Sequence, residues 1–306
     1  MNFSNMKILL VGDFMIDNYI MGTSNRLSPE APVPVVIPEK EYSIPGGAGN
    51  VAMNLNTMGA DVTCVGVVGD DIWGEKLLSI LKNQGINIDF IDIINNHPTT
   101  LKQRVYSNGK QVARIDKEKI INLISKNWIS SFSYDDAKNY QACILSDYNK
   151  GVITNANINT NYLIVDPKKN DFSAYTGANI ITPNLNELRA ATKIKLQDDN
   201  SIVTASNHLI KKYNFNYIVA KKGAAGMTIV GKNDFVKHIK PHPVQNPDVT
   251  GAGDTVVSAL SLSYAKTQDI ELAANFANSA AATAVSKSGT AAVTINEINN
   301  YIKANK

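Results

Sequence analysis

Short runs of apolar residues recur along the chain, and most of them end in glycine or in a cluster of polar residues. The runs lie at residues 7–11, 62–68, 142–145, 163–165 and 180–181. Such runs are typical of strands buried inside a parallel sheet. Elsewhere apolar residues recur at three- and four-residue spacing, as in Val256, Val257, Leu260 and Tyr264, which indicates a helix with one buried face. The pattern predicts an α/β fold with a doubly wound, mostly parallel sheet flanked by helices.

Two segments depart from this pattern and predict a small β-sheet lid. Residues 14–45 lose helical periodicity and contain prolines at positions 29, 32, 34 and 38. Because proline cannot donate to a sheet ladder, strands there are confined to a sheet edge or to a separate flap. In residues 90–115, two apolar runs flank Asn108-Gly109, a strong hairpin signal. We expect a single domain over residues 1–306, with lid segments at approximately 14–45 and 90–115.

Composition narrows the class of protein. The chain has 306 residues, a formal net charge of +3 and a hydrophobic content of 44%. This charge is too small to indicate nucleic acid or a membrane surface as a partner, and no apolar run approaches the ~20 residues that span a bilayer. Residues 1–7 lack a secretion signal, so a cytoplasmic location is expected. Cys64 and Cys143 lie in apolar runs and should be buried free thiols, and the four histidines show no metal-ligand spacing.

Residues 248–254 read Asp-Val-Thr-Gly-Ala-Gly-Asp and lead directly into an apolar helical run. Unpaired N–H groups and the positive end of the helix dipole make such a helix start an anion site. Gly251, Ala252 and Gly253 let the backbone approach a ligand, and Asp254 could accept a proton. The segment predicts a phosphoryl-transfer site in outline. The alternative is a capped connection whose aspartate merely complements the dipole.

Polar groups also follow the predicted strands at the edge where open α/β sheets bind ligands. Asp13 and Asp17 follow the first strand, and a solvated turn is the alternative for both. Gly46 and Gly47 open the next helix, where they serve either ligand approach or packing, and the amide of Asn50 can bond sugar hydroxyls. Later strands end in residues 146–151, 166–169 and 184–187, and residues 221–226 form a turn suited to nucleotide phosphates.

Two of these motifs resemble the signatures of one enzyme family. Residues 248–254 resemble the C-terminal signature of the ribokinase-like (PfkB) sugar kinases, and residues 45–50 (Pro-Gly-Gly-Ala-Gly-Asn) resemble the N-terminal one, in the same order. Within that family, residues 11–17, 28–35, 145–151 and 182–187 resemble the branch of D-glycero-β-D-manno-heptose 7-phosphate kinases. In many bacteria this kinase is the N-terminal half of a bifunctional protein.

The resemblance implies an activity, cofactors and partners. The family enzyme transfers the ATP γ-phosphoryl group to the anomeric O1 and forms the 1,7-bisphosphate used in lipopolysaccharide heptose synthesis. Mg²⁺ with ATP is the implied cofactor, and dependence on a monovalent cation is left open. The implied partners are ATP, a sugar phosphate and a second copy of the chain bound through the lids. Because residues 1–306 contain no His-x-Gly-His motif, a nucleotidyltransferase domain is not expected.

The resemblance also implies roles for individual residues. Asp254 would be the catalytic base, and Gly251, Ala252 and Gly253 would form the anion hole. Residues expected from the resemblance to hold the sugar are Asp13, Gly46, Gly47, Asn50 and Asp147. Asp17 is added to this set from its position after the first strand, and Lys102, Arg104 and Lys150 are candidates for the 7-phosphate. Residues expected to hold the nucleotide are Asn184, Glu187, Lys222, Gly223, Gly226 and Asn278, with Glu187 acting indirectly on Mg²⁺.

Two other functions compete with this interpretation. A kinase of the same fold could act on ribose, fructose or another sugar phosphate, because signatures shared by the whole family do not separate these substrates. A sugar- or nucleotide-binding regulator without catalysis is the alternative from another class. It would be favoured by a changed Asp254 or a changed turn at 251–253, and both are intact.

Overall fold

The computed structural model describes residues 1–121, 132, 134–287, 289 and 292–305. Its main element is a nine-stranded sheet in the order β13-β12-β11-β10-β9-β8-β1-β4-β5. The strands are β1 Lys7–Gly12, β4 Asp61–Gly69, β5 Asn87–Ile94, β8 Ala142–Ser146, β9 Leu163–Asp166, β10 Ile180–Ile181, β11 Tyr217–Lys221, β12 Met227–Gly231 and β13 Val236–Ile239. Neighbours from β5 to β11 are parallel, and β12 and β13 add an antiparallel edge. The expected mostly parallel sheet is confirmed.

Alternate residues of β1 enter two hydrophobic cores, one on each face of the sheet. Ile8 and Leu10 share a core with α1 Ala48–Thr57, α2 Ile72–Asn83, α5 Ala252–Thr267, α6 Ile270–Val285 and α7 Ile295–Ala304. Leu9 and Val11 share the other core with α3 Leu185–Thr192 and α4 Asp199–Tyr213. A strand covered on both faces must be apolar at every position, which explains the continuous run seen in the sequence. No helix in the described ranges combines the length and apolarity needed to cross a bilayer.

The strand order reverses beside β1, and this reversal places the site. From β1 the chain proceeds to β4 and β5 on one side and then returns to β8 on the other. Ligands of open α/β sheets bind outside the carboxyl ends of the strands at such a reversal. Gly12 and Ser146, the last residues of β1 and β8, are register partners, so the following residues Asp13 and Asp147 start side by side at this crevice.

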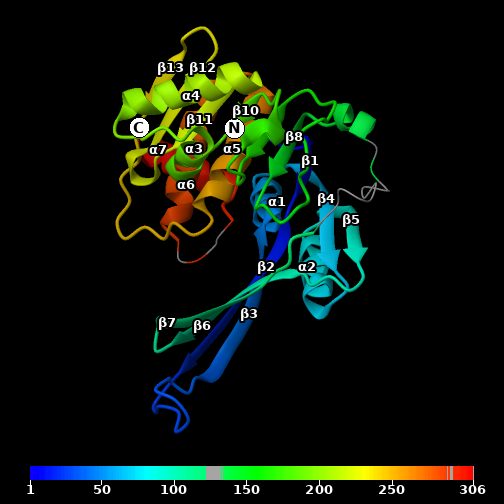
Figure 1. Ribbon diagram of the computed structural model, residues 1–306, viewed down its shortest axis with the longest axis vertical. Helices are drawn as coiled ribbons and strands as arrows, with labels where there is room; N and C mark the ends of the chain where they lie inside the picture. Colours follow the sequence, from blue (N-terminus) through cyan, green and yellow to red (C-terminus); the bar gives the residue numbers. More distant parts are fainter. Residues whose placement is uncertain (122–131, 133, 288, 290–291, 306) are drawn as a thin grey trace.

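A separate four-stranded sheet projects from the body as a long arm (Figure 1). Its strands are β2 Phe14–Thr23, β3 Ile37–Gly47, β6 Thr100–Ser107 and β7 Lys110–Lys117, in the order β3-β2-β6-β7. The ring of Tyr19 on β2 stacks on Tyr42 of β3 at 5.0 Å and faces Tyr106 of β6 at 6.3 Å between centroids. Such cross-strand aromatic pairs stabilise a thin sheet that has little core of its own.

The extent of this small sheet differs from the expected lid segments. Residues 90–94 belong to β5, which pairs with β4 in the large sheet, so the second lid segment starts at Thr100. Phe90 and Ile91 enter opposite cores, and both cores belong to the large sheet. In the first segment, β2 ends at Thr23 and β3 starts at Ile37, and the proline-rich residues between them form a connection.

Candidate active site

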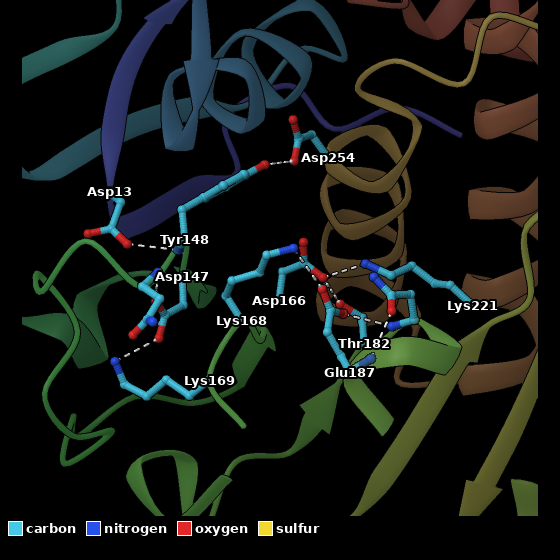
Figure 2. A network of polar contacts seen from close by, with 12 residues as sticks. Asp13, Asp147, Tyr148, Asp166, Lys168, Lys169, Thr182, Glu187, Lys221 and Asp254 are labelled. Carbon is cyan, nitrogen blue, oxygen red and sulfur yellow. Dashed lines mark hydrogen bonds and ion pairs between the residues drawn. The ribbon is translucent and has the colours of Figure 1, made fainter. Parts of the chain in front are cut away.

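Asp254 lies in the first turn of α5, and both of its carboxylate oxygens accept hydrogen bonds, of which Figure 2 shows the one from Tyr148. Oδ1 accepts from the phenol of Tyr148 at 2.5 Å, and Oδ2 accepts from the amide of Asn50 at 2.7 Å. Asn50, which was expected to bond sugar hydroxyls, therefore holds the expected base. The residues come from segments far apart in the sequence, and the fold brings them together at the carboxyl edge of the sheet.

The turn before α5 has a tight backbone conformation of the kind that glycine allows. Gly251 caps the helix with a φ of 74°, a left-handed conformation that strains residues other than glycine. The N–H of Ala252 donates to the Val249 carbonyl at 3.2 Å, so this member of the expected anion hole already has a partner. The first bond along the helix runs from Thr255 to Gly251, so the N–H of Gly253 precedes it. Among the described hydrogen bonds, none uses the N–H of Gly251 or of Gly253, so these two amides of the expected hole could face a ligand.

The surroundings of Asp254 set its proton affinity. Burial is the largest influence and raises the pKa of Asp254 to about 6. Hydrogen bonds from Tyr148 and Asn50 and the charge of Lys221 lower the pKa, whereas the charge of Asp166 raises it. The carboxylate is thus ionised at neutral pH and more basic than an ordinary aspartate, as a general base requires.

Asp13 organises the loop that follows β8. Its Oδ2 accepts from the backbone N–H groups of Tyr148 at 2.7 Å and Lys150 at 3.0 Å, and its Oδ1 accepts from Val152 at 3.2 Å. Burial raises the pKa of Asp13 to about 6, the neighbouring charge of Asp147 adds to the rise, and the three backbone bonds lower it. A residue expected to hold sugar is largely occupied in holding this loop.

Asp147, whose side chain is buried, also forms hydrogen bonds that hold the loop after β8. Its Oδ1 accepts from the N–H of Asn149 at 2.5 Å, and its Oδ2 accepts from the phenol of Tyr175 at 2.6 Å and lies 3.2 Å from the ammonium of Lys169. The side chain of Asp147 has no exposed surface. These contacts give Asp147 a structural task and do not favour the direct sugar contact expected from the sequence.

The paired glycines at the start of α1 are required by packing. A Cβ atom on Gly46 would lie 2.4 Å from the carboxylate of Asp17. A Cβ atom on Gly47, whose φ is 55°, would lie 2.6 Å from the carbonyl of Asp13. The glycines therefore allow the helix start to approach two aspartates, which is the packing alternative considered for this motif.

A cavity of about 750 Å³ opens beside the start of α5. Residues assigned from the sequence to ATP or to the phosphoryl group line it: Asn184, Gly223, Gly226, Ala252, Gly253 and Asn278. Apolar side chains form much of the remaining wall, among them Met227, Val256 and Val285. A largely apolar cavity of this size with a few polar groups at one end suits a nucleotide.

The lysine that faces this cavity is Lys221, whereas Lys222 was expected there. Lys221 lines the cavity and pairs with the carboxylate of Asp166 at 2.5 Å (Figure 2). Its Nζ would lie 3.6 Å from a Cβ atom on Gly253, which places the ammonium beside the anion hole. Lys222 instead pairs with Asp199 of α4 at 2.8 Å and does not line the cavity.

Asn184 and Glu187 form a capping box at the start of α3. The Asn184 side chain accepts from the N–H of Glu187 at 2.9 Å, and Glu187 Oε2 accepts from the N–H of Asn184 at 2.8 Å. Glu187 Oε1 accepts from the ammonium of Lys168 at 3.3 Å. Within the described residues, no group of three acidic, histidine or cysteine side chains could enclose a metal ion. This arrangement fits a Mg²⁺ ion carried mainly by phosphates and water, with Glu187 acting from a distance.

The three cations proposed for the 7-phosphate differ in availability. Arg104 pairs with Asp17 at 2.7 Å, and Lys150 pairs with Glu118 at 2.7 Å. Lys102 makes no ion pair with any described residue, and its ammonium lies 5.4 Å from the ring centroid of Tyr148. Burial lowers the pKa of Lys102. Of the three candidates, Lys102 is therefore the one whose ammonium has no ion pair among the described residues and could engage a phosphate directly.

Two residues of the site were missed by sequence reasoning. Tyr148 lies inside the polar segment 146–151, but the sequence shows no sign that its phenol reaches Asp254. Lys221 is the last residue of β11 and is followed by a second lysine, so the residue type alone does not show which of the two faces the cavity. The available signal was the strand end itself, because the last residue of a parallel strand borders the binding edge.

Comparison with known proteins gives the family. Residues 5–297 match the family described as pfkB family carbohydrate kinase. Curated relatives include proteins named bifunctional protein HldE. The one from Aliarcobacter butzleri is 39% identical over 306 residues, covering 96% of this chain and 64% of the relative, and one from Helicobacter pylori is 39% identical over 303 residues, covering 95% and 66%. The chain thus spans slightly less than two thirds of the length of these relatives.

Solved structures show the same fold at low sequence identity. The ribokinase of Arabidopsis thaliana complexed with ribose and ATP superposes with a TM-score of 0.78 at 19% identity, covering 98% of this chain and 99% of that one. Phosphofructokinase-2 of Escherichia coli in complex with potassium also gives 0.78 at 19% identity, with 99% and 100% covered. With the family match over nearly the whole chain, these findings show that the protein belongs to the pfkB family of carbohydrate kinases.

Proposed function

We propose that this sugar kinase transfers the γ-phosphoryl group of ATP to the anomeric O1 of D-glycero-β-D-manno-heptose 7-phosphate. One observation carries the proposal: the buried Asp254 lies between a nucleotide-sized cavity and Lys102, a lid cation without an ion pair among the described residues. A sugar phosphate fits this arrangement, because its hydroxyl can face the carboxylate of Asp254 while its phosphate faces the ammonium of Lys102. The similarity to the HldE proteins and the branch-like sequence motifs support the same substrate.

In the proposed reaction, Asp254 orients O1 and accepts its proton as the O–P bond forms. With its pKa near 6, the carboxylate is a weak base for a hydroxyl, so the proton moves late in the transfer. The N–H of Gly253 and the ammonium of Lys221 stabilise the negative charge on the transferring group. Mg²⁺ bound with ATP would neutralise phosphate charge, carried by the phosphates and water, with Glu187 acting on it indirectly.

The same site could serve a neighbouring substrate. Relatives of this fold include a ribokinase and a phosphofructokinase, so another sugar or sugar phosphate is the competing candidate. A sugar without a phosphate would leave Lys102 without a partner, which favours a sugar phosphate. A non-catalytic binding role is disfavoured because the acceptor Asp254, the glycine turn and the nucleotide-sized cavity lie together.

We also propose a homodimer that forms through the lids. Apolar side chains of Ile37, Tyr42, Val112 and Ile115 are exposed on β3 and β7, the outer strands of the small sheet. Light scattering after size exclusion should give twice the mass of one chain, and Ile115→Lys should lower it to one. A monomeric wild type at micromolar concentration would contradict the dimer.

The substrate is tested by ADP release with Mg·ATP across a sugar panel, with ³¹P NMR of the product. The panel contains D-glycero-D-manno-heptose 7-phosphate, sedoheptulose 7-phosphate, fructose 6-phosphate, fructose and ribose. We expect a new anomeric phosphate with the manno-heptose 7-phosphate alone, and none with the Asp254→Asn variant. Turnover on a different sugar would reject the heptose, and absence of turnover on every sugar would reject the kinase reaction.

A further inference from the structure

Tyr148 lies between the lid and the expected base. Its phenol donates to Asp254 Oδ1 at 2.5 Å, and the ammonium of Lys102, on lid strand β6, lies 5.4 Å from its ring centroid (Figure 2 shows the contact with Asp254). A cation at this distance is attracted by the face of an aromatic ring. The side chain therefore touches both groups that the proposed function assigns to the two ends of the sugar phosphate.

The backbone that carries Tyr148 is fixed by buried carboxylates. Asp13 accepts from the N–H of Tyr148 and from that of Lys150, and Asp147 accepts from the N–H of Asn149. Asn149 has a φ of 57°, which turns the chain sharply directly after Tyr148. A side chain on a loop with so many backbone bonds is held in place before any ligand binds.

The chemistry of the phenol suits a permanent donor. Burial and the charge of Asp254 raise the pKa of Tyr148 far above its ordinary value, so the phenol keeps its proton at any pH at which the enzyme works. A hydrogen bond donated to a carboxylate stabilises its charged form and fixes its plane. Two of the roughly four lone-pair positions of Asp254 are used by Tyr148 and Asn50, which leaves acceptor capacity for a substrate hydroxyl.

We propose that Tyr148 is a positioning residue for the reaction: its phenol holds the buried Asp254 carboxylate ionised and aimed at the acceptor hydroxyl. The role rests on the proposed function, because it acts through the base of that reaction. The charged groups that face Asp254 and Tyr148 are Asp166, Lys221, Asp17 and Lys102. Removing the phenol oxygen alone alters none of these charged groups.

The test is the Tyr148→Phe variant, read by two independent measurements. The first is the acid limb of kcat/KM against pH, which reports the essential base of the free enzyme. The second is carboxyl ¹³C NMR of aspartate-labelled protein, with the Asp254 signal identified from its loss in Asp254→Asn. Both should shift upward by about one pH unit, the usual scale for a lost charge-assisted hydrogen bond. Replacing Tyr148 by 3-fluorotyrosine, a stronger donor, should shift both downward.

Tyr175→Phe is the matched control. It removes a phenol–carboxylate bond of the same kind, at 2.6 Å, from Asp147 on the same loop. It should lower the melting temperature and leave the Asp254 titration unmoved. An unchanged Asp254 titration in both Tyr148 variants would overturn the inference. The NMR readout needs no turnover, so it decides about Tyr148 even if no sugar of the panel is phosphorylated.

Discussion

Replacing Asp254 by asparagine should lower turnover sharply, and the variant should gain stability relative to the wild type as the pH rises from about 4 to about 6. The variant keeps the shape of the side chain but cannot accept a proton, so turnover should fall at least ~100-fold, the usual scale of general-base loss. Nucleotide binding should change little, because the cavity wall is formed by other groups. The gain in stability has a separate cause, namely the burial of an ionised carboxylate.

The size of that gain follows from the pKa of Asp254. Folding raises the pKa from 3.8 to about 6, mainly by burial, so the folded protein binds the proton more tightly than the unfolded chain. The wild type therefore loses stability as the pH rises from about 4 to about 6, and the full cost is ~3 kcal/mol. Asparagine carries no charge at any pH and escapes this cost. The free energy of unfolding of the variant, relative to the wild type, should rise across this window and be constant above it.

Urea denaturation of both proteins between pH 4.5 and 8 measures the effect. Asp171→Asn is the matched control, because hydrogen bonds from Tyr213 and Ser173 lower the pKa of this exposed carboxylate. Its ionised form therefore stabilises the fold, and the variant should be less stable than the wild type at neutral pH. If the stability difference for Asp254→Asn did not depend on pH, the assignment of a buried carboxylate with a raised pKa would be refuted.

The remaining predictions concern substrate binding and pH. Lys102→Met should raise KM for the sugar phosphate at least ~10-fold, the scale of a lost charge-assisted contact. Lys150→Met should raise KM less. Equal effects would contradict the assignment of the 7-phosphate to Lys102. Lys221→Met should lower kcat/KM for ATP, while Lys222→Met should leave it nearly unchanged, because only Lys221 lines the cavity; initial rates at varied ATP decide this. In the wild type, kcat/KM should fall below a pH of about 6 as Asp254 takes up a proton, and a limb near pH 4 would exclude this base.

The sheet and its cores could be predicted because each rests on local pattern. A continuous apolar run such as residues 7–11 must be covered on both faces, and this alone requires helices on both sides of the sheet. The sheet to which residues 87–94 belong was harder to predict. Apolar and polar residues alternate in a strand at the edge of the large sheet just as they do in a lid strand. Which sheet it joins is decided by its pairing with β4, a contact between segments that local pattern cannot show.

The partners of side chains at the site were less predictable than the site itself. Lys221 and Lys222 are adjacent, and the residue at which β11 ends decides which of them faces the cavity. Asn50 was predicted to bond the sugar, whereas its bond to Asp254 depends on the contact of α1 with α5. Such contacts join residues some two hundred positions apart, and neither propensity nor periodicity encodes them.

Four aspartates gather at this edge of the sheet, and their hydrogen bonds separate the base from the supports. Asp13 accepts from three backbone N–H groups, and Asp147 accepts from a backbone N–H, a phenol and an ammonium. Asp166 is neutralised by its pair with Lys221. Asp254 makes no ion pair with any described residue and accepts from two neutral donors. A base must gain a proton during the reaction, and a neighbouring cation or a full set of donors would oppose that gain. Asp254, with two neutral donors and no cation paired to it among the described residues, is therefore the carboxylate of the four best equipped to take the proton.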